Sequence, residues 1–227
     1  MARTTSRRAA RTITALAALV VLSACARGLT PAERDFADAF FGDTLDADAV
    51  EVTAGIGVLP LPRPRKPDAE VAAQGPRKPP EGICERKRST QRVWTWPAAF
   101  VLYDKVYFSY DYYRPDTFEG WPDAVPYPSA LIMAHELMHV WQWQNRDLTN
   151  YTIAESASET TESVDPYWWT TEAGREFLSY GYEQQGAIVQ DYICYSLFDP
   201  DDPKRAELRA ILSPVLPIHK FDAALRR

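Results

Sequence analysis

Two of the chain's three histidines lie four residues apart in the segment AHELMHVWQWQ, residues 134–144, with Glu136 between them. Side chains four residues apart on a helix project from the same face, so His135 and His139 can both reach one metal ion. Glu136 is rotated by about 100° from His135, which places its carboxylate beside the ion as a base for water rather than as a ligand. The alternative is a buried helix whose histidines donate to backbone carbonyls. Such a helix does not explain Glu136, because burial of a charged glutamate without a partner is costly. The spacing therefore favours a zinc site.

A catalytic zinc site needs a third protein ligand and one open position. Glu183 is the favoured candidate, because a glycine and an alanine one turn later keep the helix surface shallow and allow a second helix to approach. Glu159 is the second candidate, since it follows His139 by 20 residues as in thermolysin-like enzymes, but ESASETTES is a poor helix former. The third histidine, His219, lies near the C-terminus beside a proline and is expected to be exposed. The other carboxylates considered are Glu155, Glu162, Glu172, Glu176 and Asp191.

The hydrophobic pattern predicts that helices carry these residues. The motif helix is expected from about 130 to 145, with Ser129 as its N-cap, and it is apolar on most sides and therefore buried. The helix with Glu183 is expected from about 172 to 197. Residues 149–171 are rich in Ser, Thr and Glu and are expected to form a loop. A short helix is expected to begin at Asp202-Pro203 and to end before Pro214.

The N-terminal half supplies one helix and several strands. Thr30-Pro31-Ala32-Glu33 predicts a capped helix start, the sequence FGD ends that helix, and VEVTAGIGV follows as a strand. Residues 92–113 are aromatic and β-branched, which predicts a hairpin with its turn at 103–105. Residues 60–80 contain seven prolines and are expected to form an exposed, extended loop.

The first 25 residues have the pattern of a secretory signal. Four arginines without an acid precede the apolar run ITALAALVVL, which has about half the length needed to span a bilayer. The following LSAC resembles a bacterial lipobox, so Cys25 is expected to carry a lipid anchor. Ala26 in the next position favours the outer membrane of a bacterial cell envelope. The alternatives are an ordinary signal peptide cut near Ala24 and an uncleaved helix.

Charge and cysteine content narrow the functional classes further. Removal of residues 1–24 leaves 21 basic against 31 acidic residues, a net charge of −10 that disfavours nucleic-acid binding. In an oxidising compartment, Cys84 and Cys194 are expected to form a disulfide, with two unpaired thiols as the alternative. The expected division of the chain is a signal peptide at 1–24, an N-terminal helix and strand at 25–59, a Pro-rich loop at 60–91, a core at 92–213 and a tail at 214–227.

With these motifs the chain resembles the zincins of gluzincin-like type, and more narrowly the metallopeptidase-like core domain of contractile-injection-system and Vgr-related bacterial proteins. The quoted motifs are HE-x-x-H-V-W-Q, FGD with its V-x-V strand, AFVLYDKVYFS, YRPD and EQQGAIVQDY, and together they cover about residues 29–197. The resemblance implies a small α+β fold, with His135 and His139 as zinc ligands, Glu136 as general base and Glu183 as third ligand.

The chain departs from thermolysin-like enzymes at Ala187, where they have an aspartate four residues after the glutamate ligand. The carboxylate that would orient a ligating histidine is therefore unassigned, with Asp191 as one candidate. Tyr180 and Tyr182 are candidates to stabilise an oxyanion because they lie close to Glu183, but ordinary packing is the favoured explanation for each. The expected function is a lipid-anchored zinc metallopeptidase acting on peptides or proteins. A zincin-like binding module without catalysis is the alternative from another class, and an amidase or esterase could use the same chemistry.

Overall fold

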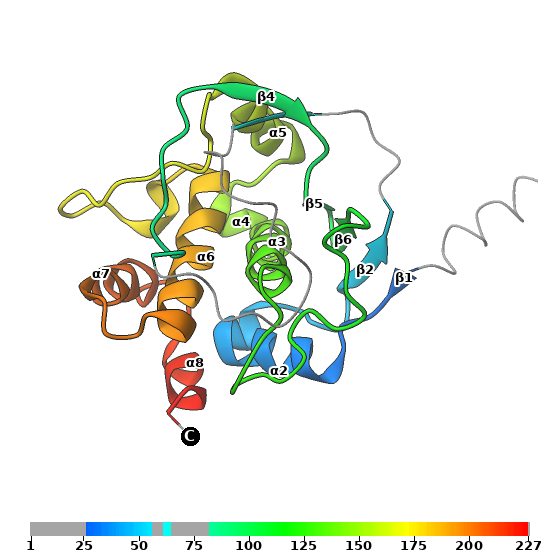
Figure 1. Cartoon of the computed structure of the whole chain (residues 1–227), viewed down its shortest axis with the longest axis vertical. Helices are drawn as coiled ribbons and strands as arrows, with labels where there is room; N and C mark the ends of the chain where they lie inside the picture. Colours follow the sequence, from blue (N-terminus) through cyan, green and yellow to red (C-terminus); the bar gives the residue numbers. More distant parts are fainter. Residues whose placement is uncertain (1–25, 56–60, 65–81, 227) are drawn as a thin grey trace, which may run out of the picture.

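The candidate residues are held by a long buried helix, α3 (Ser129–Gln144), that lies between a small sheet and a second long helix, α6 (Tyr182–Phe198) (Figure 1). This arrangement is seen in a computed structural model, which describes residues 26–55, 61–64 and 82–226. The combination of helices with a mixed sheet confirms the prediction of an α+β fold.

The main sheet has the strand order β1-β2-β6-β5. Strands β2 and β6 are parallel, and the other neighbours are antiparallel. Strands β5 and β6 form the predicted hairpin, with the turn at Tyr103 in a left-handed conformation (φ 59°). Alternate residues, among them Val106 and Phe108, are buried beneath the sheet. The strands are β1 (Ala26–Arg27), β2 (Glu51–Ala54), β5 (Ala99–Leu102) and β6 (Lys105–Phe108).

The remaining helices surround α3 and α6. Helix α2 begins with the predicted capping box and packs against α8, where the rings of Phe40 and Phe221 meet edge to face at 5.2 Å. Gly42, at φ 57°, follows the end of α2, as the sequence FGD predicts. The bounds are α2 (Pro31–Phe40), α4 (Arg146–Thr149), α5 (Ile153–Glu162), α7 (Pro203–Leu212) and α8 (His219–Ala224), with 3-10 turns at Gly42–Thr44 and Phe177–Ser179.

Several boundaries differ from the prediction. Residues 153–162 form helix α5 instead of a loop, because Thr152 caps it and Ser156 and Thr160 are buried on its inner side. Helix α6 begins at Tyr182, not near 172, since a 3-10 turn and the N-cap Gly181 precede it. Ser129 is the first residue of α3 rather than its cap, and its hydroxyl donates to the Tyr112 carbonyl.

Two segments expected to lie outside the core also take part in the structure. Within the Pro-rich stretch, β3 (Leu61–Pro64) pairs antiparallel with β4 (Arg92–Thr95), in a two-stranded ribbon whose short edge tolerates proline. The segment expected to be a tail contains α8, whose Phe221 is fully buried. His219, at the start of α8, is exposed as predicted.

The cysteines and the N-terminus give two further results. A disulfide joins Cys84 to Cys194 on α6. The expected signal at 1–24 and the lipid anchor at Cys25 lie outside the described residues. Among the helices of the described ranges, none is both long enough and apolar enough to cross a bilayer.

A buried ion pair fixes the N-terminal entry to the fold. The Glu33 carboxylate is fully buried and accepts hydrogen bonds from both terminal nitrogens of Arg27, at 2.6 and 2.8 Å, and from the Thr117 amide and hydroxyl. It also accepts from the Thr30 amide, which completes the capping box. Burial raises the pKa of Glu33, but these hydrogen bonds outweigh it and hold the pKa below its ordinary value of 4.5. The carboxylate therefore joins β1, α2 and the loop before α3.

Replacement of Glu33 by Gln should lower the free energy of unfolding at pH 7 by about 2 kcal/mol, because it leaves buried donors without their anion. A group whose folded pKa is depressed stabilises the fold above its unfolded pKa and loses that contribution as the pH falls through the folded value. Urea unfolding between pH 7 and pH 3 should therefore show the difference between wild type and Glu33→Gln shrinking below pH 4.5. Asp48→Asn, in an exposed pair with Arg34, should cost less than about 1 kcal/mol. Equal stabilities at pH 7 would contradict the assignment.

Candidate metal centre

Helices α3 and α6 bring two imidazoles and one carboxylate to a single point. His135 Nε2 lies 3.2 Å from Glu183 Oε2 and 3.1 Å from His139 Nε2, and the His139 to Glu183 distance is 3.5 Å. One ligand atom from each residue lies within 4.8 Å of the others, and all three residues are buried. The favoured candidates from the sequence are therefore the residues that meet.

The spacing of the three atoms fits a metal ion. Bonds of about 2.0–2.1 Å in a tetrahedron place neighbouring ligand atoms about 3.4 Å apart. The observed separations of 3.1, 3.2 and 3.5 Å bracket that value. Two imidazole nitrogens and one carboxylate oxygen also form a donor set that zinc uses in catalytic sites. The residues present could thus hold a zinc ion and leave a fourth position open.

Gly186 allows α6 to approach this closely. A Cβ atom placed on Gly186 would lie 2.6 Å from His135 Cε1 and 2.8 Å from both ring nitrogens, which is closer than real Cβ contacts permit. The His135 ring thus occupies the space that a side chain would need. The sequence predicted that Gly186 keeps the surface of the helix shallow beside Glu183, and the close contact of the His135 ring with Gly186 confirms this.

A neutral amide, rather than a carboxylate, orients His139. Gln142 Oε1 lies 2.8 Å from His139 Nδ1, while Gln142 Nε2 donates to Gln185 Oε1 (3.0 Å) and to the Tyr182 carbonyl (3.3 Å). Because the amide oxygen can only accept, Nδ1 of His139 carries a proton, so in the neutral ring it is Nε2 that presents a lone pair to the centre. The amide of Gln142 therefore selects the tautomer that a metal requires.

The expectation that Asp191 might orient a histidine is wrong. Both oxygens of Asp191 accept from Arg86, at 2.6 and 2.9 Å, and the Trp169 indole also donates to it. A guanidinium satisfies both carboxylate oxygens through two parallel hydrogen bonds, which is a stronger pairing than a single bond to an imidazole.

Helix α5 positions Glu183 from the opposite side. The Thr160 hydroxyl donates to Glu183 Oε1 at 3.1 Å, which leaves Oε2 to face the histidines. Glu159, the second candidate ligand, instead accepts from the backbone amides of Tyr182 and Glu183, at 2.9 and 3.0 Å, at the N-terminus of α6. Its carboxylate satisfies amides that have no partner within the helix. Glu159 is thus a cap for α6 and lies outside the group of three.

Electrostatics favour one positive charge at the centre. Burial opposes the charge on Glu183, but the attraction of His139 and the hydrogen bond from His135 lower its pKa well below the ordinary range. Burial likewise opposes a charge on His139, and Glu183 outweighs it and raises the pKa to about 9. Burial dominates at His135, whose pKa is lowered. A metal cation would supply the charge that the proton on His139 provides here.

Glu136 and two tyrosines lie beside the group. Glu136 is 6% exposed, and its charge contributes to raising the pKa of both His139 and Tyr151. The ring of Tyr151 lies 6.3 Å from that of His139, and the ring of Tyr167 lies 5.6 Å from that of His135. The sequence did not point to either tyrosine, because no spacing rule links them to the motif.

The two tyrosines suggested by the sequence point elsewhere. The hydroxyl of Tyr180 donates to the Thr170 carbonyl at 3.1 Å, and that of Tyr182 donates to the Asn150 carbonyl at 2.9 Å. Both hydroxyls are therefore bound to backbone.

No family model matches the chain, and no curated protein matches it either. Among solved structures the chain is similar to the effector domain of Pseudomonas aeruginosa VgrG2b. The two share 21% sequence identity over 83% of each chain, with a TM-score of 0.49.

The purified chain should bind about one zinc ion, as measured by elemental mass spectrometry after zinc supply and dialysis. His139→Ala and Glu183→Ala should each lose it, because two remaining ligands cannot hold the ion. Circular dichroism of both variants should show retained helix content. A folded wild type that takes up neither zinc nor, in parallel trials, cobalt or nickel would contradict the centre.

Gly186→Ala should weaken zinc binding about 10- to 100-fold, because the added methyl group displaces the His135 ring. Competition with a chelator measures the affinity. Gly28→Ala is the matched control, since a Cβ at Gly28 meets nothing within 4 Å. An affinity of Gly186→Ala equal to that of wild type would show that the close approach is not required.

Proposed function

We propose that the chain is a zinc metallopeptidase of the bacterial cell envelope, anchored by a lipid on Cys25. The observation that carries this proposal is the group of His135, His139 and Glu183, with Glu136 beside it. The signal pattern and the lipobox-like LSAC support the location. Peptides or proteins are the proposed substrates.

The residues have separate tasks in the proposed reaction. When bound, zinc would supply a Lewis acid that acidifies water and polarises a carbonyl. Glu136 would accept a proton from the attacking water and pass it to the leaving amine, as general base and then general acid. Gln142 and Thr160 would keep His139 and Glu183 in position through the hydrogen bonds described above.

Tyr151 is the proposed donor to the negative charge that develops on the carbonyl oxygen. Its ring lies beside His139, and the negative charges of Glu183 and Glu136 contribute to raising the pKa of its hydroxyl. Burial raises the pKa of Tyr151 to about 12, so the hydroxyl keeps its proton at neutral pH. A protonated hydroxyl in a partly dry site can stabilise an oxyanion by donating a hydrogen bond.

Glu136→Gln should reduce hydrolysis of a peptide library about 10²- to 10⁴-fold, because glutamine cannot accept the proton of water. The zinc content should stay as in wild type, since Glu136 is not among the ligands. Mass spectrometry of the library and of the bound metal measures both quantities on the same preparation. If wild type and variant process the library equally, the peptidase proposal fails and a zincin-like binding module takes its place.

A further inference from the structure

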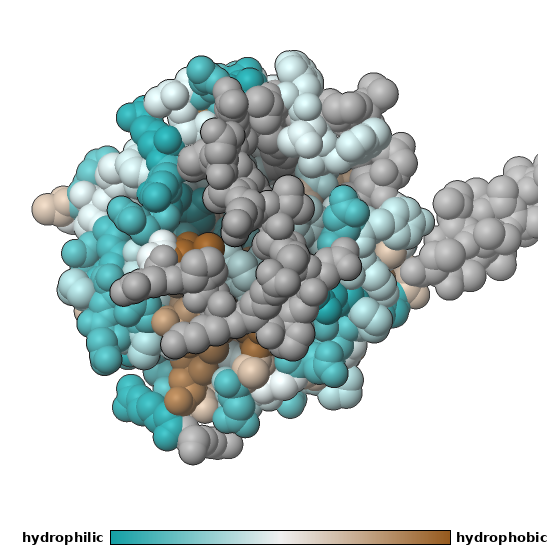
Figure 2. Space-filling view, viewed as in Figure 1, coloured by the Kyte–Doolittle hydropathy of each residue, from teal (hydrophilic) through white to brown (hydrophobic). Residues whose placement is uncertain are grey.

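Two buried glutamine side chains link the metal centre to the start of α6. Hydrophilic side chains cover most of the coloured surface in Figure 2, yet Gln142 on α3 and Gln185 on α6 are only 0% and 1% exposed. A primary amide has an NH2 group that donates and an oxygen that accepts, and burial without partners is costly for both. The partners of these two side chains therefore determine which way each amide points.

The two amides form a chain of hydrogen bonds that ends on the backbone. Gln185 Nε2 donates to the carbonyl oxygen of Tyr180 at 2.7 Å, and Gln185 Oε1 accepts from Gln142 Nε2 at 3.0 Å. Gln142 Nε2 also donates to the carbonyl oxygen of Tyr182 at 3.3 Å, and Gln142 Oε1 lies 2.8 Å from His139 Nδ1. Both carbonyls lie where the chain enters α6.

The direction of this chain is fixed at its backbone end. A carbonyl oxygen can only accept, so Gln185 must turn its NH2 group toward Tyr180. Its oxygen then faces Gln142, which must turn its own NH2 group toward that oxygen and toward Tyr182. Rotation of either amide by about 180° would set two buried oxygens against each other. Only the oxygen of Gln142 is left for His139, so Nδ1 of the ring must donate.

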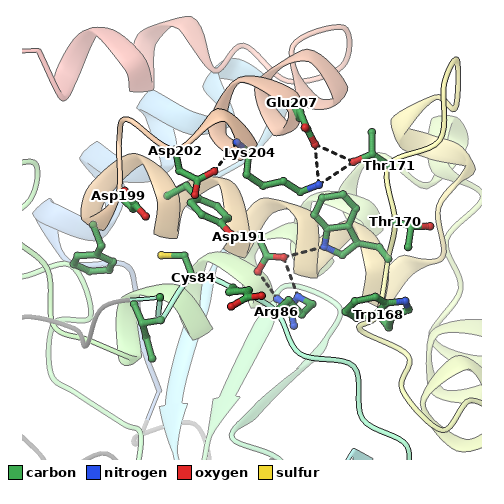
Figure 3. A pocket seen from close by; sticks show the side chains of 16 residues that line it. Cys84, Arg86, Trp168, Thr170, Thr171, Asp191, Asp199, Asp202, Lys204 and Glu207 are labelled. Carbon is green, nitrogen blue, oxygen red and sulfur yellow. Dashed lines mark hydrogen bonds and ion pairs between the residues drawn. The ribbon is translucent and has the colours of Figure 1, made fainter.

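The same direction explains why a neutral group orients His139. Further along α6 the contacts are charged, since Asp191 accepts two hydrogen bonds from Arg86 (Figure 3). A carboxylate in place of either glutamine would have no hydrogen for the backbone carbonyl that the amide now faces. The hydrogen-bond chain therefore requires an amide at both positions.

We propose that Gln185 is a positioning residue of the metal centre. It acts through Gln142 and keeps the proton of His139 on Nδ1, so that Nε2 offers its lone pair to a metal ion. The Tyr180 carbonyl is the origin of this order, and three hydrogen bonds separate it from the ring. The inference rests on the metal binding of the proposed function and does not depend on the hydrolysis of peptides.

Zinc affinity of the full chain, measured by competition with a chelator, tests whether Gln185 acts through Gln142. Gln142→Met should weaken zinc binding about 10- to 100-fold and Gln185→Met about tenfold, because methionine is unbranched and similar in length but has no N–H group. The double variant should bind zinc within about twofold of Gln142→Met alone, since Gln185 then has no route to His139. Losses that add up would overturn the proposal, because they would assign to Gln185 only a general stabilisation of α6.

Gln144→Met is the matched control. Gln144 lies on the same helix as Gln142, and its amide bonds to the backbone of Asp46 and to the side chain of Asp104 instead of to the centre. Its zinc affinity should equal that of wild type. Additive losses in an active wild type overturn only the role of Gln185. Coupled losses in a zinc-binding wild type that cleaves no peptide support this role and refute only the peptidase function.

Nuclear magnetic resonance of isotope-labelled histidine reads the ring proton directly and does not depend on the folding of a variant. In wild type, Nδ1 of His139 should carry a proton that exchanges slowly with water, because this proton is buried in the hydrogen bond to Gln142. Gln185→Met should speed this exchange about five- to tenfold, which corresponds to the loss of one hydrogen bond further along the chain. An unprotonated Nδ1 in wild type would overturn the proposal.

Discussion

The close packing of α6 on α3 is the contact on which the rest of the site depends. It is possible because residue 186 has no side chain, so the His135 ring can lie directly against the helix. The same approach carries Glu183, one turn earlier, to 3.2 Å from His135. Two imidazoles and a carboxylate buried together are costly without a compensating cation. The packing of α6 on α3 at Gly186 thus brings the three ligand atoms together and also buries a carboxylate that a cation would stabilise.

The groups that orient the ligands add no charge. Gln142 holds His139 through an amide, and Thr160 holds Glu183 through a hydroxyl. With neutral imidazoles, the charged side chains at the centre are then Glu183 and its neighbour Glu136. Their two negative charges together equal the charge of a divalent cation. A monovalent ion would leave one buried carboxylate uncompensated, which is unfavourable in a dry site.

Local signals in the sequence were sufficient for some elements and failed for others. The capping box at Thr30 and the Asp202-Pro203 start gave α2 and α7, because both are set by a few neighbouring residues. Helix α5 was missed because its Ser and Thr residues have low helix propensity, and it is stabilised by packing of its buried face next to α6. Strand β3 was missed because it forms only by pairing with a segment about 30 residues later.

The same distinction holds at the site. The motif spacing pointed to His135 and His139, and the small residues after Glu183 pointed to the third member of the group. Gln142 and Thr160 could not be found in this way, since neutral side chains have no characteristic spacing and act only once two helices meet. Asp191 was suggested by charge alone, and a guanidinium from a distant segment takes up its oxygens.

The disulfide closes a covalent ring that runs from Cys84 to Cys194, a sequence separation of 110 residues. The ring contains His135, His139 and Glu183, together with the loops that join α3, α5 and α6. A single cut in any of these loops leaves all three residues in one covalently connected molecule. In a compartment that contains proteases, the centre is therefore protected against dissociation after one nick. This protection lasts only while the bond stays oxidised.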